Sequence, residues 1–189
     1  PVRSPHHTSS YASLIGGGTV PRPGEVTLAH RGVLFLDEFP EFDRRVIETM
    51  RQPLEDRTIS ISRARGSLTF PASIMLVAAM NPCPCGNRGS SKDCVCAPRQ
   101  LAYYSRKLSG PILDRIDLWI SMPQVEYKKL ADDTSTASET SSDIRKRVTK
   151  ARIQQTKRFG NDNTKTNAHM NLREIKKFCT LDPEEKQII

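Results

Sequence analysis

The sequence predicts an α/β fold, with a parallel sheet and flanking helices. Three observations carry this prediction: the apolar runs at 32–36 and 74–80, a helix-like segment between them, and a further apolar run at 118–120. Short apolar runs of this kind are typical of strands, whereas the segment between the first two repeats its apolar residues with helical spacing.

The first run, Gly32–Leu36, is followed at once by Asp37 and Glu38. Its four consecutive large apolar residues leave no polar face, which predicts a strand buried on both sides of a parallel sheet. Ligand sites of open α/β sheets lie at the carboxyl ends of such strands. In a nucleotide-hydrolysing site, the first carboxylate holds Mg²⁺ and the second orients or deprotonates the attacking water. The alternative is a core strand that ends in solvated acids.

The downstream elements follow in a definite order. A helix is predicted from Asp43 to about Glu55, because four apolar side chains share one face: Val46, Ile47, Met50 and Leu54. The second apolar strand, 74–80, ends at Asn81 and Pro82. The third, 118–120, follows the segment 110–117, which contains Arg115.

A hairpin is predicted between the helix and the second strand. Residues 58–62 and 67–70 alternate apolar with polar side chains on either side of a turn, 63–66, that contains a glycine. Arg63 and Arg65 lie in this turn. They suit salt-sensitive, sequence-independent contact with a nucleic-acid backbone. The alternative is that they pair with acids at a subunit interface.

Together these features resemble the magnesium-chelatase-like AAA+ ATPases of the ComM/YifB type, over residues 1 to about 178. The blocks that carry the resemblance are 3–8 (RSPHHT), 23–32 (PGEVTLAHRG), 52–56 (QPLED) and 81–86 (NPCPCG). The resemblance implies a partial AAA+ P-loop NTPase core from its Walker B strand onward, with a pre-sensor-1 hairpin. It also implies part of a helical lid after that core.

The resemblance further implies the roles of individual residues. Asp37 would position Mg²⁺ bound to ATP, and Glu38 would polarise the attacking water. Asn81 matches sensor 1. Arg115 matches the arginine finger that one subunit inserts into its neighbour's site, which implies a ring, most commonly a hexamer. Histidines 6 and 7 have no acidic or cysteine partner at a telling spacing, and we predict a structural role for both.

One family element is missing from the 189 residues. They contain no Gly-x-x-x-x-Gly-Lys-Ser/Thr, the loop that cradles nucleotide phosphates. We therefore expect these residues to be a part of a longer chain, and this part to begin just after the loop. We also expect it to hydrolyse no ATP alone. We also expect an incomplete sheet, because the strand before that loop lies between the sensor 1 strand and the last strand in the family, and its absence leaves ladder groups unpaired.

Four of the five cysteines fall in the loop 83–96: Cys83, Cys85, Cys94 and Cys96. Four thiolates brought together suit a closed tetrahedral Zn²⁺ site, with sulfur ligands at about 2.3 Å. Two disulfides are the first alternative, although a cytosolic ATPase keeps such thiols reduced. Unligated thiols are the second. The fifth, Cys179, is predicted to lie on a helix face.

Composition separates three segments: the core at 1–130, a linker at 131–142 that is rich in Asp, Thr and Ser, and a partial lid at 143–189. The linker has no large apolar residue and is predicted to be flexible. From Asp143 to Phe159 the chain is strongly basic, which predicts a helix with a solvated basic face or, alternatively, a nucleic-acid contact. Further short helices are predicted at 171–178 and 182–189.

A net charge of +8 favours an anionic partner, but a solvated surface explains it equally. No apolar stretch is long enough to span a bilayer, so we expect no membrane partner. The resemblance to a cytosolic ATPase implies a cytoplasmic protein. Three functions follow from the resemblance: a DNA motor acting on single or branched strands, as in competence; a chelatase-type motor that drives metal insertion through partner subunits; and a non-catalytic binding fragment. The basic hairpin favours the DNA motor.

Overall fold

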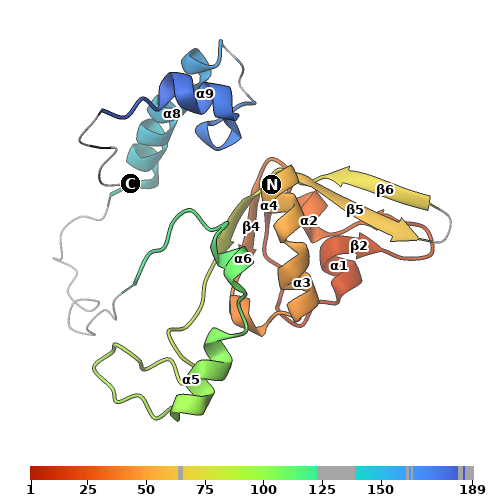
Figure 1. Cartoon of the computed structure of the whole chain (residues 1–189), viewed down its shortest axis with the longest axis vertical. Coiled ribbons are helices and arrows are strands. Elements are labelled where there is room, and N and C mark those ends of the chain that lie inside the picture. Colours follow the sequence, from red (N-terminus) through yellow and green to blue (C-terminus); the bar gives the residue numbers. More distant parts are fainter. Residues whose placement is uncertain (64–65, 123–138, 161, 163, 183–184, 186–189) are drawn as a thin grey trace. The chain divides into compact units, whose positions relative to one another are not determined.

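The computed structural model describes the chain except for residues 64–65, 123–138, 161, 163, 183–184 and 186–189, and the side chain of Arg63. The predicted linker at 131–142 lies mostly outside the described residues. The chain divides into two compact units, Pro1–Val125 and Glu126–Ile189, which are described separately (Figure 1).

A three-stranded parallel sheet organises the first unit. The strands are β1 (Val2–Arg3), β4 (Val33–Leu36) and β7 (Met75–Ala78), in the order β1-β4-β7. Val2 pairs with Val33, and Leu36 pairs with Ala78. All three strands therefore end at the same edge of the sheet, and the residues that follow each of them are brought to that edge.

Helices cover one face of this sheet. They are α1 (Tyr11–Ile15), α2 (Glu25–Leu28), α3 (Arg44–Thr49) and α6 (Gly110–Leu113), and the short 3-10 helix η1 (Phe39–Glu41) follows β4. Their apolar side chains form one core with two residues of β4. Its fully buried members include Leu14, Ile15, Val26, Leu34, Leu36, Phe39, Val46, Ile47, Met50 and Ile112. This burial supplies the main favourable term for the fold.

The predicted helix at 43–55 is divided into α3 and α4 (Arg51–Asp56), with Met50 between them. Pro53 explains the division. Inside a helix, a proline cannot donate a hydrogen bond to the carbonyl four residues earlier, which is that of Thr49 here, and its ring clashes with that carbonyl. In the first turn of a new helix a proline is tolerated. The predicted apolar face survives the division, since Val46, Ile47 and Met50 are buried and Leu54 packs against the core.

Two expectations about the strands are wrong. Only one face of β4 is fully buried, and β7 leaves Met75 64% and Val77 40% exposed, because the helices pack on one side of the sheet. The predicted strand at 118–120 is not formed, and its side chains are 59–80% exposed. Strand β7 lies at one edge of the sheet and has no ladder partner on its outer side within the described residues.

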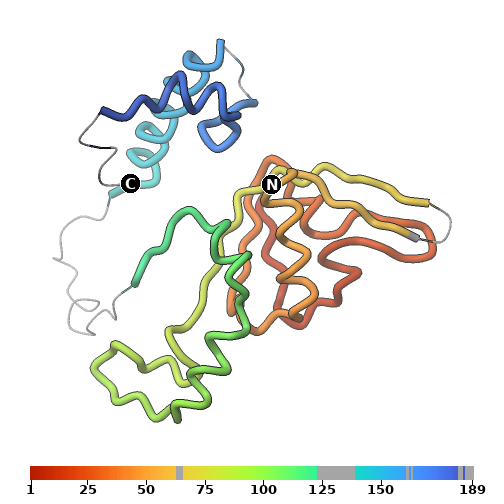
Figure 2. Tube along the Cα trace, in the orientation of Figure 1, coloured from red at the N-terminus to blue at the C-terminus, as the bar shows by residue number. Residues whose placement is uncertain are grey.

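The predicted hairpin is present as β5 (Thr58–Arg63) and β6 (Gly66–Pro71), paired antiparallel with Ile59 opposite Phe70. A second antiparallel pair, β2 (Gly16–Gly17) and β3 (Arg22–Pro23), extends in the same direction (Figure 2). At Gly16, whose φ is 106°, a Cβ atom would lie 2.5 Å from the carbonyl oxygen of Arg22 and 2.7 Å from the Ile61 side chain of the hairpin. Glycine is therefore required where the two pairs meet.

The second unit contains α8 (Ser141–Arg158), the 3-10 helix η2 (Asn167–His169) and α9 (Leu172–Phe178). Helix α8 begins two residues before the predicted start because the Thr140 side chain accepts the N–H of Asp143. Phe159 and Phe178 meet edge to face at 6.0 Å between ring centres. The helix predicted at 182–189 lies largely outside the described residues. Among the described helices, none combines the length and apolar character that crossing a membrane requires.

Candidate functional site

Asp37 and Glu38 lie at the carboxyl edge of the sheet, directly after β4, and both are exposed. The backbone ladder continues past this point, because the N–H of Phe39 donates to the carbonyl of Ala79 at 3.0 Å and the N–H of Ala79 donates to Leu36 at 2.9 Å. The acidic pair is thus held beside the segment that leads from β7 to Asn81. The structure brings three of the predicted site residues to one edge.

Glu38 has a partner that the sequence analysis missed. Its Oε2 atom lies 2.8 Å from Nδ1 of His7. The ring of His7 in turn stands edge to face against Phe42, at 6.4 Å between centres. Pairing of β1 with β4 carries the residues after β1 to the edge where Glu38 lies. The two-residue β1 was too short to be recognised from its sequence.

The backbone of Asn81 is held by helix α5 (Pro98–Ser105). The hydroxyl of Tyr104, which is 9% exposed, donates to the Asn81 carbonyl at 3.0 Å. Burial raises the pKa of the Tyr104 hydroxyl still further above neutral pH. Asn81 itself is exposed.

Arg115 does not stand with the acidic pair as an unpaired cation. Its guanidinium forms an ion pair with Glu55 of α4 and donates to the carbonyl of Pro111. Its Nε atom is buried and has no hydrogen-bond partner among the described residues. The sequence analysis did not identify Glu55 as a partner, because the two residues are far apart in the chain.

The structure brings the four clustered cysteines together. Each offers one sulfur, and all four sulfurs lie within 4.8 Å of one another. The measured pairs are Cys83–Cys85 at 3.4 Å, Cys83–Cys94 at 3.7 Å and Cys85–Cys94 at 3.7 Å. Cys179 is exposed and lies in the other unit.

Two of these thiols differ widely in pKa. A backbone N–H of Asn87 beside Cys85 lowers the pKa of that thiol to about 6. Burial, in contrast, raises the pKa of Cys96 to about 12. Four thiols packed this closely cannot all ionise without a cation between them, since like charges oppose each other's ionisation.

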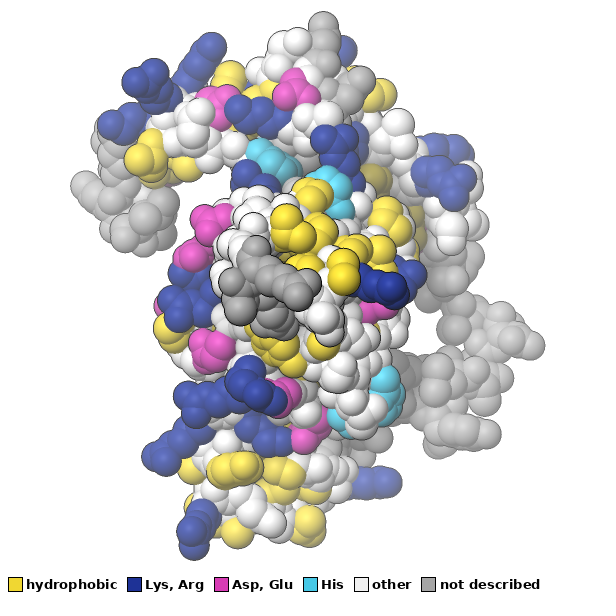
Figure 3. Space-filling view, turned by 90° about the vertical axis from the view of Figure 1, so that its right-hand side faces the viewer, with side chains coloured by type: hydrophobic (Ala, Val, Ile, Leu, Met, Phe, Trp, Pro, Cys, Tyr) yellow, Lys and Arg dark blue, Asp and Glu magenta, His cyan; other side chains and the backbone are white. Residues whose placement is uncertain are grey.

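The predicted nucleic-acid residues are only partly described. Arg63 closes the hairpin ladder opposite Gly66, and Arg65 lies outside the described residues. On the face drawn in Figure 3, Lys and Arg side chains form separate groups with Asp and Glu among them. This face therefore shows no single basic patch.

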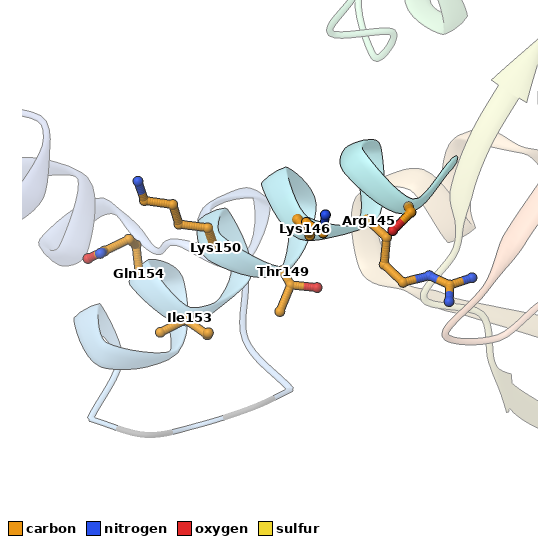
Figure 4. Close-up of a pocket in the computed structure, with 7 residues that line it drawn as sticks. Arg145, Lys146, Thr149, Lys150, Ile153 and Gln154 are labelled. Atoms are coloured by element: carbon orange, nitrogen blue, oxygen red, sulfur yellow. The ribbon is translucent and has the colours of Figure 1, made fainter. Parts of the chain in front are cut away.

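Helix α8 carries the other basic cluster. Arg145, Lys146 and Lys150 line a shallow hollow along it, together with Thr149 and Ile153 (Figure 4). Part of this charge is already paired, since Lys146 lies 3.1 Å from Asp143 and Arg147 pairs with Glu139. The predicted solvated face agrees with this helix, on which no residue is buried.

The chemistry available at the sheet edge is that of hard oxygen ligands. Oδ1 of Asp37 accepts the N–H of Glu38 at 2.8 Å, and its second oxygen has no hydrogen-bond partner among the described residues. An exposed carboxylate of this kind fits Mg²⁺, which is usually held by one or two carboxylates together with the phosphates of a nucleotide. The residues present therefore fit the protein ligands of a magnesium–nucleotide site.

Comparisons with known proteins show the family of this chain. Residues 1–130 match the family described as magnesium chelatase, subunit ChlI, and residues 138–189 match its C-terminal counterpart. Competence protein ComM of Haemophilus influenzae is 46% identical over 98% of this chain and 35% of its own length. The uncharacterized protein YifB of Escherichia coli is 44% identical over the same shares.

A more distant similarity covers part of the chain. DNA replication licensing factor Mcm6 of Drosophila melanogaster is 33% identical over 96 residues, which is 51% of this chain and 11% of that protein. The chain spans about a third of the length of ComM and YifB.

Proposed function

The chain belongs to the magnesium chelatase ChlI family, in its ComM/YifB-type branch, and on that premise we propose that it is part of an AAA+ ATPase that translocates or remodels DNA. One observation carries the ATPase proposal. The exposed Asp37–Glu38 pair and the Asn81 segment share the carboxyl edge of a parallel sheet, the edge at which open α/β sheets bind ligands.

In this proposal the residues divide the work. Asp37 would hold the magnesium ion, which when bound neutralises charge on the phosphates. Glu38 would accept a proton from the attacking water, and its contact with His7 would fix the direction of the carboxylate. The amide of Asn81 would hold the same water or the terminal phosphate. The Tyr104 hydroxyl would keep Asn81 in place through its hydrogen bond to the Asn81 backbone carbonyl.

Arg115 would act on the site of a neighbouring subunit, which requires self-association in a ring, with a hexamer as the family expectation. Its pairing with Glu55 would then keep the guanidinium oriented until the neighbour is in place. The 189 residues alone would hydrolyse no ATP, because they contain no phosphate loop.

Three observations support DNA, single-stranded or branched, as the partner acted on. The chain has a net charge of +8, and the predicted arginine turn belongs to a hairpin that is present in the structure. Its relatives also include proteins named for competence and for DNA replication. Contact with phosphates by Arg63 and Arg65 would give binding that depends on salt but not on sequence.

The test is ATP hydrolysis by the complete protein, measured with and without single-stranded and branched DNA, beside the variant Glu38→Gln. We expect DNA to stimulate turnover severalfold. We expect Glu38→Gln to lower it by about 10²–10⁴, the range for loss of a general base. Nucleotide binding, measured by fluorescence titration, should be retained in the variant.

Each other outcome has a distinct meaning. Hydrolysis that Glu38→Gln abolishes but DNA does not change would keep the ATPase and overturn the DNA motor. The chelatase-type motor would then be the remaining proposal. Equal hydrolysis by the variant and the parent protein would show that Glu38 is not the base.

A further inference from the structure

We propose that Cys83, Cys85, Cys94 and Cys96 bind one Zn²⁺ ion in a closed tetrahedral site, and that this ion holds together the loop between β7 and α5. The site lies outside the ATPase residues. Only its consequence for Asn81 rests on the proposed function, and the metal itself can be tested without measuring hydrolysis.

The sulfur positions fit a single ion at their centre. Zinc–sulfur bonds of about 2.3 Å in a regular tetrahedron place the sulfurs about 3.8 Å apart. The three separations among Cys83, Cys85 and Cys94, of 3.4, 3.7 and 3.7 Å, lie close to this value, and the Cys96 sulfur lies within 4.8 Å of each of them. They are far longer than a disulfide bond, which is about 2.05 Å. The spacing therefore favours a shared ion over two disulfides.

The same spacing limits which metal group fits. All four sulfurs lie within 4.8 Å of one another, which leaves room for one ion between them but not for a cluster of several irons and sulfides. Four thiolates in tetrahedral array suit zinc, and structural sites of this type have no open position.

The backbone around the first cysteine pair is shaped to support a thiolate. The N–H of Gly86 donates to the carbonyl of Cys83 at 3.0 Å, and the N–H of Arg88 donates to the Cys83 sulfur at 3.4 Å. Gly86 has a φ of 78°, a conformation that favours glycine. The Arg88 N–H reaches the sulfur itself, and a hydrogen bond of this kind orients a metal ligand and stabilises its charge.

The loop has little else to hold it. Residues 81–97 contain no helix or strand, and Cys83 is their only buried residue. Val95, the large aliphatic residue of the loop, is 80% exposed. Because burial of apolar side chains contributes little to the order of this segment, a metal ion would supply order that apolar packing does not.

The position of the cysteine site links it to Asn81. Cys83 follows Asn81 by two residues, and Cys96 precedes the start of α5 by two. The Tyr104 hydroxyl of α5 holds the Asn81 carbonyl at 3.0 Å. The ion would therefore close a loop whose two ends meet at Asn81, and would keep that residue at the sheet edge.

The test is the zinc content of the complete protein, purified without chelators, supplied with Zn²⁺ and then freed of excess metal. Native mass spectrometry should show one zinc per chain. Cys94→Ser and Cys96→Ser should each weaken binding at least about tenfold in competition with a chromogenic chelator, because ligand loss costs more than loss of a supporting group. Cys179→Ser is the matched control and should retain one zinc.

Thiol alkylation of the parent protein avoids any variant that fails to fold. With zinc bound, only Cys179 of these five thiols should react rapidly, and a chelator should expose the other four. Rapid reaction of all five thiols in the presence of zinc would overturn the proposal. So would bound iron, a disulfide between any of the four, or one zinc per chain retained at unchanged affinity in Cys94→Ser.

Discussion

Glu38 combines an exposed carboxylate with a strained backbone. Its φ of 51° lies in the left-handed region, which a non-glycine residue adopts at a cost of about 1–3 kcal/mol. The Asp37 carboxylate accepts its N–H, and His7 contacts its side chain. Strain of this kind is retained where surrounding contacts hold a residue in place, and it clusters at functional sites. The conformation therefore supports the role proposed for this residue.

At Arg115, the finger role predicts a large and specific effect. In the complete protein, Arg115→Ala should lower the ATP turnover rate by about 10³–10⁵, the range for such arginines. Nucleotide binding and ring assembly should be retained, since the arginine acts on charge that develops during the reaction. Steady-state hydrolysis and nucleotide titration measure the two effects separately.

Glu55→Gln supplies the control, because it removes the charged partner of Arg115 without removing the guanidinium. Turnover within severalfold of the parent protein is expected. If instead Arg115→Ala retains the turnover of the parent protein, Arg115 has no part in the neighbouring site.

At the scale of elements, the β5–β6 hairpin should carry DNA contacts at its turn. Replacing both Arg63 and Arg65 with Ala removes two possible phosphate contacts. The slope of log affinity against log salt should then fall in magnitude by about 1.4, at about 0.7 per contact with single-stranded DNA. Fluorescence anisotropy at several salt concentrations measures this slope.

The hairpin itself offers the matched control. Ser62 and Ser67 lie opposite each other near the turn, with their hydroxyls 3.2 Å apart. Replacing both with Ala disturbs the same end without changing its charge, so the slope should not move. An unchanged slope in the double arginine variant would remove the hairpin from the DNA-binding proposal.

At the scale of the whole molecule, one ion pair links the start of the first unit to its helices. Arg3 of β1 donates to both carboxylate oxygens of Glu25 of α2, at 2.6 and 2.7 Å. The hydrogen bond from Arg3 lowers the pKa of Glu25 below its ordinary value of 4.5. The folded chain therefore binds this proton less tightly than the unfolded chain does.

Glu25→Gln should consequently lower the unfolding midpoint of the chain at pH 7. The contribution of the pair is complete above about pH 4.5 and is lost as the pH falls through the lower pKa of the folded state. The difference between the two proteins should thus shrink towards pH 3 in thermal melts followed by circular dichroism.

Glu48→Gln is the comparison for this measurement, because its carboxylate lies 3.9 Å from Arg51 on a more exposed surface. Its effect should be small at every pH. A destabilisation by Glu25→Gln that stayed constant from pH 7 to pH 3 would show that the charge of the pair is not its source.

Much of the first unit follows from local sequence patterns. The β4 and β7 strands, the hairpin and the apolar face of 46–54 were predictable, because side-chain periodicity reflects burial directly. The clustering of the four cysteines could equally be predicted from their spacing in the sequence. The acidic pair was placed at the sheet edge by one rule, that ligand sites lie at the carboxyl ends of parallel strands.

The sequence by itself determined the family, the order of these elements and the candidate residues, because each depends on short motifs. Only the tertiary structure decided which residues those candidates touch: His7 at Glu38, Tyr104 at Asn81 and Glu55 at Arg115. It also decided that one face of the sheet is open and that residues 118–120 form no strand. These outcomes depend on which segments pack together at long range, and no local pattern encodes the presence of a partner.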